Sequence, residues 1–492
     1  MFERLRHEKT LCRWGPIPML LMLTFGILSC GPQEKETREG ASYHTSDITP
    51  RVSNESLQTK ERSVSKQKIE SPLNFILVII DTLRADHLGC YGHSRNTTPN
   101  IDLLAKRSHR FTNTISPAPW TRSAIASIVT SKWTLEHGIQ SESPQEILSD
   151  QFYTIQEFFN DRGYTTAAFI TNPHLSFGLT QSFGSVDYQG DGHAAPTYNK
   201  VLKWLDTHGN EKFFLLVHNN DPHDRYFYHE QFNFTKKESK WRVVKDLYRD
   251  VPGEVNCRST ENLTVLKDAE LAEMKGNYDG EIAYTDHQLG RLLNRLKKRG
   301  LDKNTVVVVT ADHGEEFLDH GRYFHGCTLY NELLHVPLIV HIPGRDQGVH
   351  DQLVSTVDIF PTVVDLLDRP KLASYRFSGR SLIPIIENRP QKSNIVFSST
   401  GFRGDVRYSL TVGNHKLISS DQRVPREIFD IRRDPRETKN LIDNTQLTKR
   451  LTNQLNRFIA GIDHPKDQPE RSTPTVKDEL KKQLEALGYI AE

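Results

Sequence analysis

The clearest pattern along the chain is a pair of short, strongly apolar segments that are each followed by an aspartate. Residues 306–311 read four valines, a threonine and an alanine, and Asp312 follows them directly. Residues 74–80 form the second segment, which is followed by Asp81. Apolar runs this short and rich in β-branched residues are typical of strands buried on both faces of a parallel sheet. Because the carboxyl ends of neighbouring parallel strands meet at one edge, we expect Asp81 and Asp312 to bind the same cation.

Strand and helix patterns alternate over much of the chain. Besides the two segments above, we predict strands at 165–171 and 213–217 and helices at 101–107, 123–130, 154–162, 198–208, 270–299 and 357–367. This alternation predicts an α/β fold with a mostly parallel sheet flanked by helices. Beyond about residue 372, short segments at 409–412, 416–419 and 427–430 predict an antiparallel meander in a smaller C-terminal α+β subdomain.

The N-terminal segment has the pattern of an export signal. Basic residues precede an apolar run at 17–28, which is too short for a good transmembrane helix. The run ends at Ile27-Leu28-Ser29-Cys30, which resembles the lipobox of bacterial lipoproteins. We therefore expect a signal peptide at 1–29, a lipid on Cys30, and an exported protein anchored to the bacterial membrane, in the periplasm or on the outer surface. A plain secretory signal and an uncleaved anchor are the alternatives.

The remaining organisation follows from composition. Residues 30–72 are mostly polar and predict a flexible tether, since they cannot bury enough apolar surface to offset their chain entropy. A catalytic core is expected at 73–370, the subdomain at 371–463, and a tail at 464–492 with a terminal helix at 477–487.

Charge and cysteine content exclude some classes of protein. The chain has 63 Lys and Arg against 62 Asp and Glu, so its net charge of +1 does not suggest a nucleic-acid partner. Beyond Cys30 only Cys90, Cys257 and Cys327 remain. Three thiols in so long a chain predict neither a disulfide framework nor a zinc site.

Thr121 is a candidate site residue from its position alone. Prolines at 117 and 119 favour an extended approach to the helix predicted at 123–130. Thr121 therefore lies near a helix N-terminus, where free backbone N–H groups favour an anion. A simple N-cap is the alternative role for a threonine there.

Several stretches, in order along the chain, resemble the sulfatase family of the alkaline phosphatase superfamily. They are 79–92 (IIDTLRADHLGCYG), 98–102 (TPNID), 221–223 (DPH), 278–286 (YDGEIAYTD), 312–315 (DHGE) and the ending at 487–490 (LGYI). The resemblance implies an alkaline-phosphatase-like fold and a hydrolase acting on sulfuric or phosphoric ester bonds.

The nucleophile position departs from the family pattern. Sulfatases carry a Cys or Ser that is oxidised to formylglycine, followed by x-Pro-Ser-Arg. Alignment on 128–131 puts Thr121 at that position, with Ser123, Ala124 and Ile125 in place of Pro, Ser and Arg. An oxidised threonine would give a ketone, so the resemblance implies that Thr121 itself acts as an alkoxide nucleophile, as threonine does in phosphodiesterase and phosphoglycerol-transferase branches.

The ligand positions depart as well. The resemblance assigns Asp81, Asp312, His313 and Thr121 to the metal. Calcium sulfatases often have Asp-Asp and Asp-Asn pairs, and the imidazole of His313 moves the preference towards Mn²⁺ or Zn²⁺, with Ca²⁺ as the alternative. The two-zinc branches use an Asp-x-x-x-His motif, but Asp286 is followed by Gly290, so one divalent ion is expected.

The resemblance further implies in-line displacement by Thr121 at sulfur or phosphorus. His174, His223 and His325 would stabilise the non-bridging oxygens or protonate the leaving group, although each histidine alone could be structural. Asn172 stands where the family has a lysine. The substrate is expected to be a small-molecule, glycan or lipid ester, with phosphate favoured. A true sulfatase, a transferase and a catalytically silent lipoprotein that binds anionic ligands are the alternatives.

Overall fold

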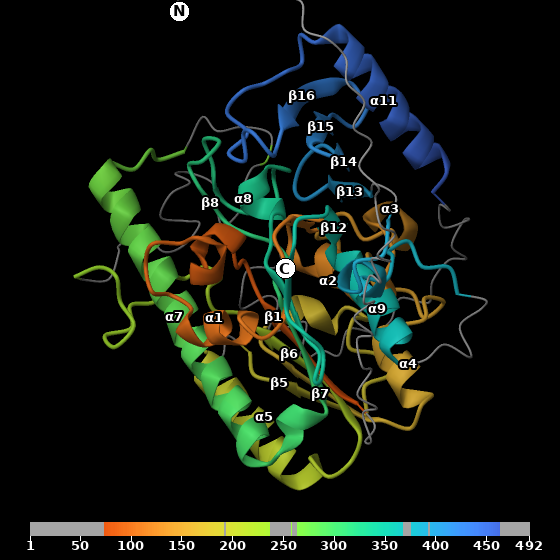
Figure 1. Cartoon of the computed structure of the whole chain (residues 1–492). Coiled ribbons are helices and arrows are strands. Elements are labelled where there is room, and N and C mark those ends of the chain that lie inside the picture. The colour runs from red at the N-terminus through yellow and green to blue at the C-terminus, as the bar shows by residue number, and fades with distance from the viewer. Residues whose placement is uncertain are drawn as a thin grey trace, which may run out of the picture. The chain divides into compact units, whose positions relative to one another are not determined.

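The central feature of the fold is an eight-stranded sheet with helices on both sides (Figure 1). The computed structural model describes residues 73–190, 193–236, 257, 263–367, 375–391 and 394–462, and the statements below concern these residues. Cys30, the expected tether and the expected terminal helix lie outside them. The strands are, in spatial order, β11 (Gly348–His350), β2 (His109–Phe111), β10 (Leu338–His341), β7 (Thr305–Thr310), β1 (Asn74–Ile80), β6 (Phe213–Asn219), β4 (Thr165–Ile170) and β5 (Ser185–Tyr188).

The middle of this sheet is parallel. Strand β1 pairs in parallel with β7 on one side and with β6 on the other, while β10 runs antiparallel to β7 and β2. The four valines of β7 are at most 5% exposed, as expected for a strand covered on both faces. Burying each of them contributes roughly 1.5–3 kcal/mol.

Two groups of helices cover the sheet. The long helix α7 (Asp268–Lys298) packs against α5 (Ala194–His208) and α1 (Pro99–Ala105). Figure 1 shows α2 (Thr121–Thr130), α4 (Ile155–Asn160) and α9 (Ile359–Leu366) on the other side of the strands. The short helices are α3 (Thr134–His137), α8 (Asn331–Leu334) and α10 (Ile383–Ile386).

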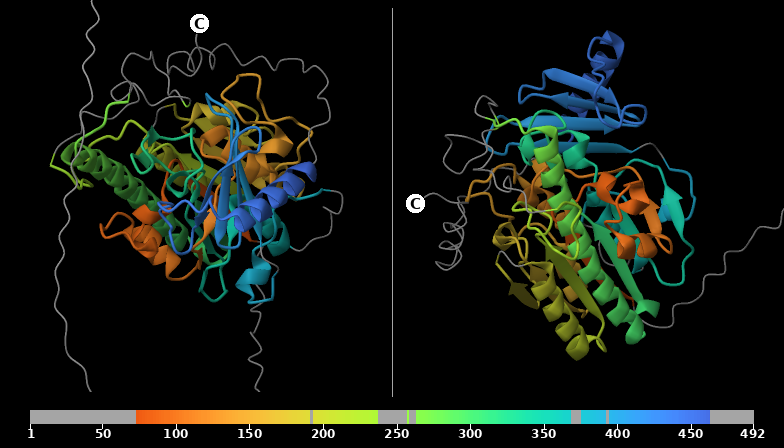
Figure 2. Two further views of the ribbon diagram at one scale, coloured as in Figure 1. Left: turned by 90° about the horizontal axis from the view of Figure 1, so that it is seen from above. Right: turned by 90° about the vertical axis from the view of Figure 1, so that its left-hand side faces the viewer.

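A second sheet lies beyond one end of the central one, as the right-hand view of Figure 2 shows. It is an antiparallel meander of β13 (Ile395–Thr400), β14 (Arg407–Val412), β15 (His415–Ser419) and β16 (Pro425–Asp430). Helix α11 (Thr445–Ala460) buries Leu451, Leu455 and Ile459 in the apolar cluster beneath this sheet. Four short strands form two further pairs, with β12 (Val354–Ser355) beside β3 (Thr114–Ile115), and β8 (Glu316–Phe317) beside β9 (Tyr323–Phe324).

The fold agrees with the prediction from sequence at the level of class and elements. The mostly parallel sheet, its helical cover and the antiparallel C-terminal sheet are confirmed. Strand β13 and helix α11 were not predicted. No helix in the described ranges combines the length and hydropathy needed to span a bilayer.

The prediction about the cysteines was wrong. Cys257 and Cys327 form a disulfide, with 5.1 Å between their Cα atoms, and Cys90 is free. Spacing along the chain did not reveal this pair, because Cys257 and the segment that follows β9 come together only in the folded protein.

Candidate active site

The candidate site forms where β1 and β7 end. The register pairs Ile79 with Thr310, so continuing by two residues brings Asp81 opposite Asp312. Both aspartates are fully buried. The two apolar segments of the sequence thus deliver two carboxylates to one edge of the sheet, as predicted.

Two of the stretches that resemble the sulfatase family, 278–286 and 312–315, position the segments that follow β1 and β7. The Tyr278 hydroxyl of α7 donates to the carbonyl of Thr82 at 2.7 Å and accepts from the backbone N–H of Arg84 at 3.0 Å. Gly314 has no room for a side chain, because a Cβ there would lie 2.0 Å from the carbonyl oxygen of Glu332. These contacts fix the positions of Asp81 and Asp312 relative to each other.

His313 completes a group of three close ligand atoms with Asp81 and Asp312. Its Nε2 lies 3.5 Å from Asp81 Oδ1 and 3.7 Å from Asp312 Oδ2. Its Nδ1 lies 2.9 Å from the carbonyl oxygen of Gly314, which can only accept, so Nδ1 carries the proton. Burial lowers the pKa of His313, which leaves Nε2 with a lone pair that faces the carboxylates.

The Thr121 hydroxyl lies within this group. Its Oγ1 is 3.5 Å from Asp81 Oδ2 and 3.3 Å from His313 Nε2. Thr121 is the first residue of α2, and Trp120 is the N-cap, so the alternative of a threonine N-cap does not apply. Asn172 reaches the same carboxylate, since its Nδ2 donates to Asp81 Oδ2 at 2.9 Å.

The residues present fit a divalent cation. Burial and the neighbouring Asp312 carboxylate raise the pKa of Asp81, because two buried like charges repel each other. Asp81 Oδ1 and Asp312 Oδ2 are buried without a hydrogen-bond partner among the described residues. Such oxygens are costly to bury unless they are paired or coordinate a metal. Two carboxylates, a neutral imidazole and a hydroxyl form a donor set for a borderline or hard divalent ion.

The other predicted histidines lie around this group. His325 packs against His313 with tilted rings whose centroids are 4.5 Å apart, and edge-on against His223 at 4.7 Å. His325 Nδ1 lies 2.9 Å from Glu315 Oε1. Burial, followed by the charge of His223, lowers the pKa of His325 to about 3, so this imidazole is neutral.

His223 has the opposite character. Its Nδ1 lies 2.7 Å from Asp224 Oδ1. Burial alone would lower the pKa of His223, but the Asp224 carboxylate more than offsets this and raises it well above the usual range. His223 is therefore the imidazolium of this group and can donate a proton.

His174 is oriented by an arginine, Arg122, that was not predicted as a site residue. Arg122 Nη2 lies 3.0 Å from His174 Nδ1, and an arginine can only donate. The guanidinium also donates to the carbonyl of Ser143 at 2.8 Å and lies over the ring of Phe177 at 3.8 Å. Burial and Arg122 lower the pKa of His174 well below its usual value, so His174 is neutral with its proton on Nε2.

His218 was also missed as a site residue. It is fully buried on β6, where it pairs with Ile79 of β1. Its Nε2 lies 3.7 Å from Asp81 Oδ2 and 3.8 Å from Asp312 Oδ2. Residues paired in a parallel ladder point to the same face of the sheet. Knowing that His218 pairs with Ile79 would therefore have placed His218 on the face of Asp81, two residues beyond Ile79.

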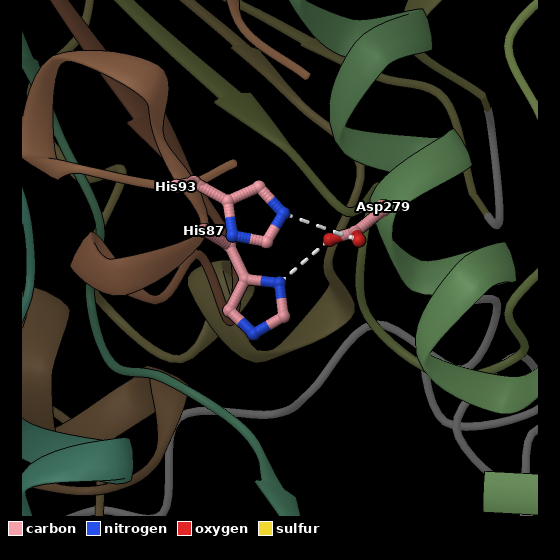
Figure 3. Close-up of side chains that lie close together, drawn as sticks. All are labelled: His87, His93 and Asp279. Atoms are coloured by element: carbon pink, nitrogen blue, oxygen red, sulfur yellow. Dashed lines mark hydrogen bonds and ion pairs between the residues drawn. The ribbon is translucent and has the colours of Figure 1, made fainter. Parts of the chain in front are cut away.

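A second group of candidate ligands, His87, His93 and Asp279, lies elsewhere (Figure 3). His87 Nδ1 is 2.6 Å from Asp279 Oδ1, and His93 Nε2 is 3.3 Å from Asp279 Oδ2. Arg95 Nη1 lies 2.6 Å from the same Oδ2, so the positive guanidinium balances the negative charge of the carboxylate. This network joins the segment after β1 to α7, and it explains the aspartate of the Tyr278-Asp279-Gly280 stretch without a metal.

Asp286, the residue compared with the two-zinc motif, has a structural partner. Its carboxylate accepts from the backbone N–H groups of Asn100 and Ile101, at 3.0 Å and 2.8 Å, in the first turn of α1. A Cβ at Gly290 would lie 2.5 Å from the Asn100 side chain, so a histidine would not fit there without rearrangement.

Comparisons with known proteins agree with this geometry. A family model described as Sulfatase matches residues 73–369, and one described as N-sulphoglucosamine sulphohydrolase, C-terminal, matches residues 319–464. The arylsulfatase of Clostridium perfringens is 24% identical over 449 residues, which cover 77% of this chain and 92% of that protein.

Solved structures share the fold. A 2-O GAG sulfatase superposes with a TM-score of 0.65 at 20% identity, over 79% of this chain and 92% of that one. The phosphonate monoester hydrolase of Agrobacterium radiobacter gives a TM-score of 0.64 at 18% identity, over 79% of this chain and 95% of that one. The first family model alone spans more than half of the sequence. The chain therefore belongs to the sulfatase family of hydrolases, as its motifs predicted.

Proposed function

We propose that this protein is a metal-dependent hydrolase of phosphate esters in which Thr121 is the nucleophile. The observation that carries the proposal is the position of the Thr121 hydroxyl, 3.5 Å from Asp81 Oδ2 and 3.3 Å from His313 Nε2. A hydroxyl beside the ligand atoms at the first residue of a ten-residue helix is well placed to attack a bound anion.

The chemistry of a threonine favours phosphate over sulfate. A formylglycine hydrate releases sulfate by expelling it from a hemiacetal, which requires no attack on the sulfated enzyme. A threonine sulfate has no such route, so the enzyme could turn over only by hydrolysis at sulfur. A phosphorylated hydroxyl is open to attack by water at phosphorus in a metal site. A 2-O GAG sulfatase and a phosphonate monoester hydrolase both share this fold, so the fold does not decide between the two esters.

The proposed reaction has two displacements. The Thr121 hydroxyl passes its proton to Asp81 Oδ2, its acceptor at 3.5 Å, and Thr121 Oγ1 forms a bond to phosphorus while the bond to the leaving oxygen breaks. His223, an imidazolium beside Asp224, supplies the proton that the leaving alkoxide needs. In the second displacement, water attacks phosphorus and gives a proton to His223, which is now neutral. The bond between the Thr121 oxygen and phosphorus breaks, this oxygen regains its proton from Asp81, and phosphate leaves.

The other residues hold and orient the substrate. Neutral His174 can donate from Nε2, and Arg122 fixes that tautomer. His325, between His313 and His223, is a second neutral imidazole for the non-bridging oxygens. One divalent ion, with Mn²⁺ or Zn²⁺ favoured over Ca²⁺ because of the imidazole ligand, would lower the pKa of the Thr121 hydroxyl and neutralise charge.

The substrate class and the location are part of the proposal. Similar proteins include an ulvan-active sulfatase and a 2-O GAG sulfatase, and these names favour a glycan or other small-molecule ester as substrate. We propose export and a lipid anchor at Cys30. The disulfide between Cys257 and Cys327 supports export, since disulfides persist in oxidising compartments.

The test compares matched esters on the purified protein with Mn²⁺, Zn²⁺ and Ca²⁺ in turn. We expect aryl phosphate mono- or diesters to be hydrolysed faster than the matching aryl sulfates. Thr121→Val, which keeps the shape of the side chain and removes the hydroxyl, should be inactive on both, and Thr121→Ser should retain activity. Faster release of sulfate, or an oxidised residue in the peptide that contains Thr121, would establish a sulfatase instead. Equal activity of Thr121→Val and wild type would exclude this nucleophile.

A further inference from the structure

His218 is a buried imidazole that makes no hydrogen bond within the described part of the chain, although two carboxylates lie within 4 Å of it. Its side chain is fully buried, and neither ring nitrogen has a hydrogen-bond partner among the described residues. Leaving a buried polar group unsatisfied costs roughly 1–3 kcal/mol, so such a group calls for an explanation.

The surroundings of His218 point to a cation. The Asp81 and Asp312 carboxylates each lie within 4 Å of its Nε2, at 3.7 Å and 3.8 Å. His313 Nε2, already a candidate ligand, lies 3.5 Å and 3.7 Å from the same two carboxylates. Ligand atoms of one ion with bonds of about 2.1 Å are separated by roughly 3 to 4 Å, so both imidazoles stand at ligand-like distances.

The backbone holds His218 in this position. It lies on a central strand and pairs with Ile79, whereas Asp81 is two residues beyond Ile79 on the same face. Its Nε2 lies 3.8 Å from Asp312 Oδ2, which has no hydrogen-bond partner among the described residues, and the second oxygen of the Asp81 carboxylate, Oδ1, has none either. The ligand atoms of Asp81, Asp312 and His313 lie within 4.8 Å of one another, and His218 Nε2 lies against the two carboxylates of that group.

We propose that His218 is an additional protein ligand of the divalent ion, through Nε2. The inference rests on the proposed metal-dependent function, and it raises the donor set to two carboxylates, two imidazoles and the Thr121 hydroxyl. A second nitrogen donor favours Zn²⁺ and Mn²⁺ further over Ca²⁺, which prefers oxygen ligands alone. The competing explanation is an imidazolium that pairs with both carboxylates and excludes the metal.

The test measures metal binding rather than activity. Full-length protein in detergent is stripped of metal, and its affinities for Mn²⁺, Zn²⁺ and Ca²⁺ are measured by calorimetry for wild type, His218→Gln, Asp312→Ala and His341→Gln. His341 is a matched control, because it is a buried strand histidine that bonds the carbonyl of Arg107. Pulsed EPR of bound Mn²⁺ counts the imidazole nitrogens directly.

We expect His218→Gln to weaken Mn²⁺ and Zn²⁺ at least tenfold, to weaken Ca²⁺ less, and to reduce the count from two imidazoles to one. His341→Gln should match wild type. If His218→Gln fails to fold, His218→Cys serves, since a thiolate should retain Zn²⁺ and lose Mn²⁺.

Unchanged or tighter binding by His218→Gln, or a single imidazole in wild type, would overturn the inference. If Asp312→Ala still weakened binding in that case, the proposed metal centre would stand without His218. Absence of binding by wild type would overturn the centre itself and the inference with it.

Discussion

The disulfide between Cys257 and Cys327 offers a prediction about stability whose size follows from the fold. The two cysteines are 70 residues apart in the chain. Between them lie the end of the polar insertion, helix α7, strand β7 and the loop that carries Asp312 and His313. Removing the bond frees this whole segment in the unfolded chain, while the folded chain keeps its other contacts.

The expected loss can be calculated from the length of the loop. For a loop of 70 residues, the chain-entropy relation gives about 4 kcal/mol at 25 °C. Measured values are often smaller than the relation predicts. Since 1 kcal/mol moves the Tm of a large domain by about 2 °C, we expect Tm to fall by roughly 5 to 8 °C.

The assay compares wild type with Cys257→Ser/Cys327→Ser and with Cys90→Ser. Thermal and guanidinium unfolding are followed with and without a reductant. Reductant should destabilise wild type to the level of the double variant, leave the double variant unchanged, and destabilise Cys90→Ser as much as wild type, because Cys90 is the free thiol.

A second effect should appear at the active site. Cys327 lies two residues after His325, and Thr400 of β13 donates to the carbonyl of Gly326 between them at 2.7 Å. Loss of the disulfide should therefore lower turnover under conditions in which the protein remains folded. If reductant changed neither Tm nor the number of reactive thiols in the denatured protein, the disulfide and the reasoning from it would be refuted.

Two further predictions concern the anchor and the proton donor. Cys30→Ser should abolish partition into the detergent phase and leave an unprocessed precursor, whereas unchanged partition would mean that the apolar run itself is the anchor. Asp224→Asn should shift the alkaline limb of the kcat profile to lower pH by about one unit or more, because losing this carboxylate lowers the pKa of His223 while Asp81, Glu315 and His325 still face it. An unshifted limb would exclude the His223–Asp224 pair as the source of the proton.

The secondary structure was largely predictable because its signals are local. The uninterrupted apolar runs of β1 and β7 identify buried strands without knowledge of their neighbours. Strand β13 and helix α11 were missed. Helix α11 buries Leu451, Leu455 and Ile459, which recur every four residues after an Asn444 N-cap, so its amphipathic signal is local and was present in the sequence.

The disulfide was missed for a different reason. The loop-closure cost of joining two distant cysteines depends weakly on their separation, so spacing alone neither favours nor excludes a pair. The two cysteines come together only in the folded protein, where their Cα atoms are 5.1 Å apart.

The candidate site shows where reasoning from sequence can be extended. Asp81 and Asp312 were predictable because each ends an apolar run, but His218 lies inside a strand, where a lone histidine usually has a structural role. Its meaning depends on register, since only the pairing of His218 with Ile79 puts it on the face of Asp81. A one-residue slip would turn His218 to the opposite face. Site residues at strand ends can therefore be predicted from the pattern along one strand, whereas those within a strand require knowledge of its partner.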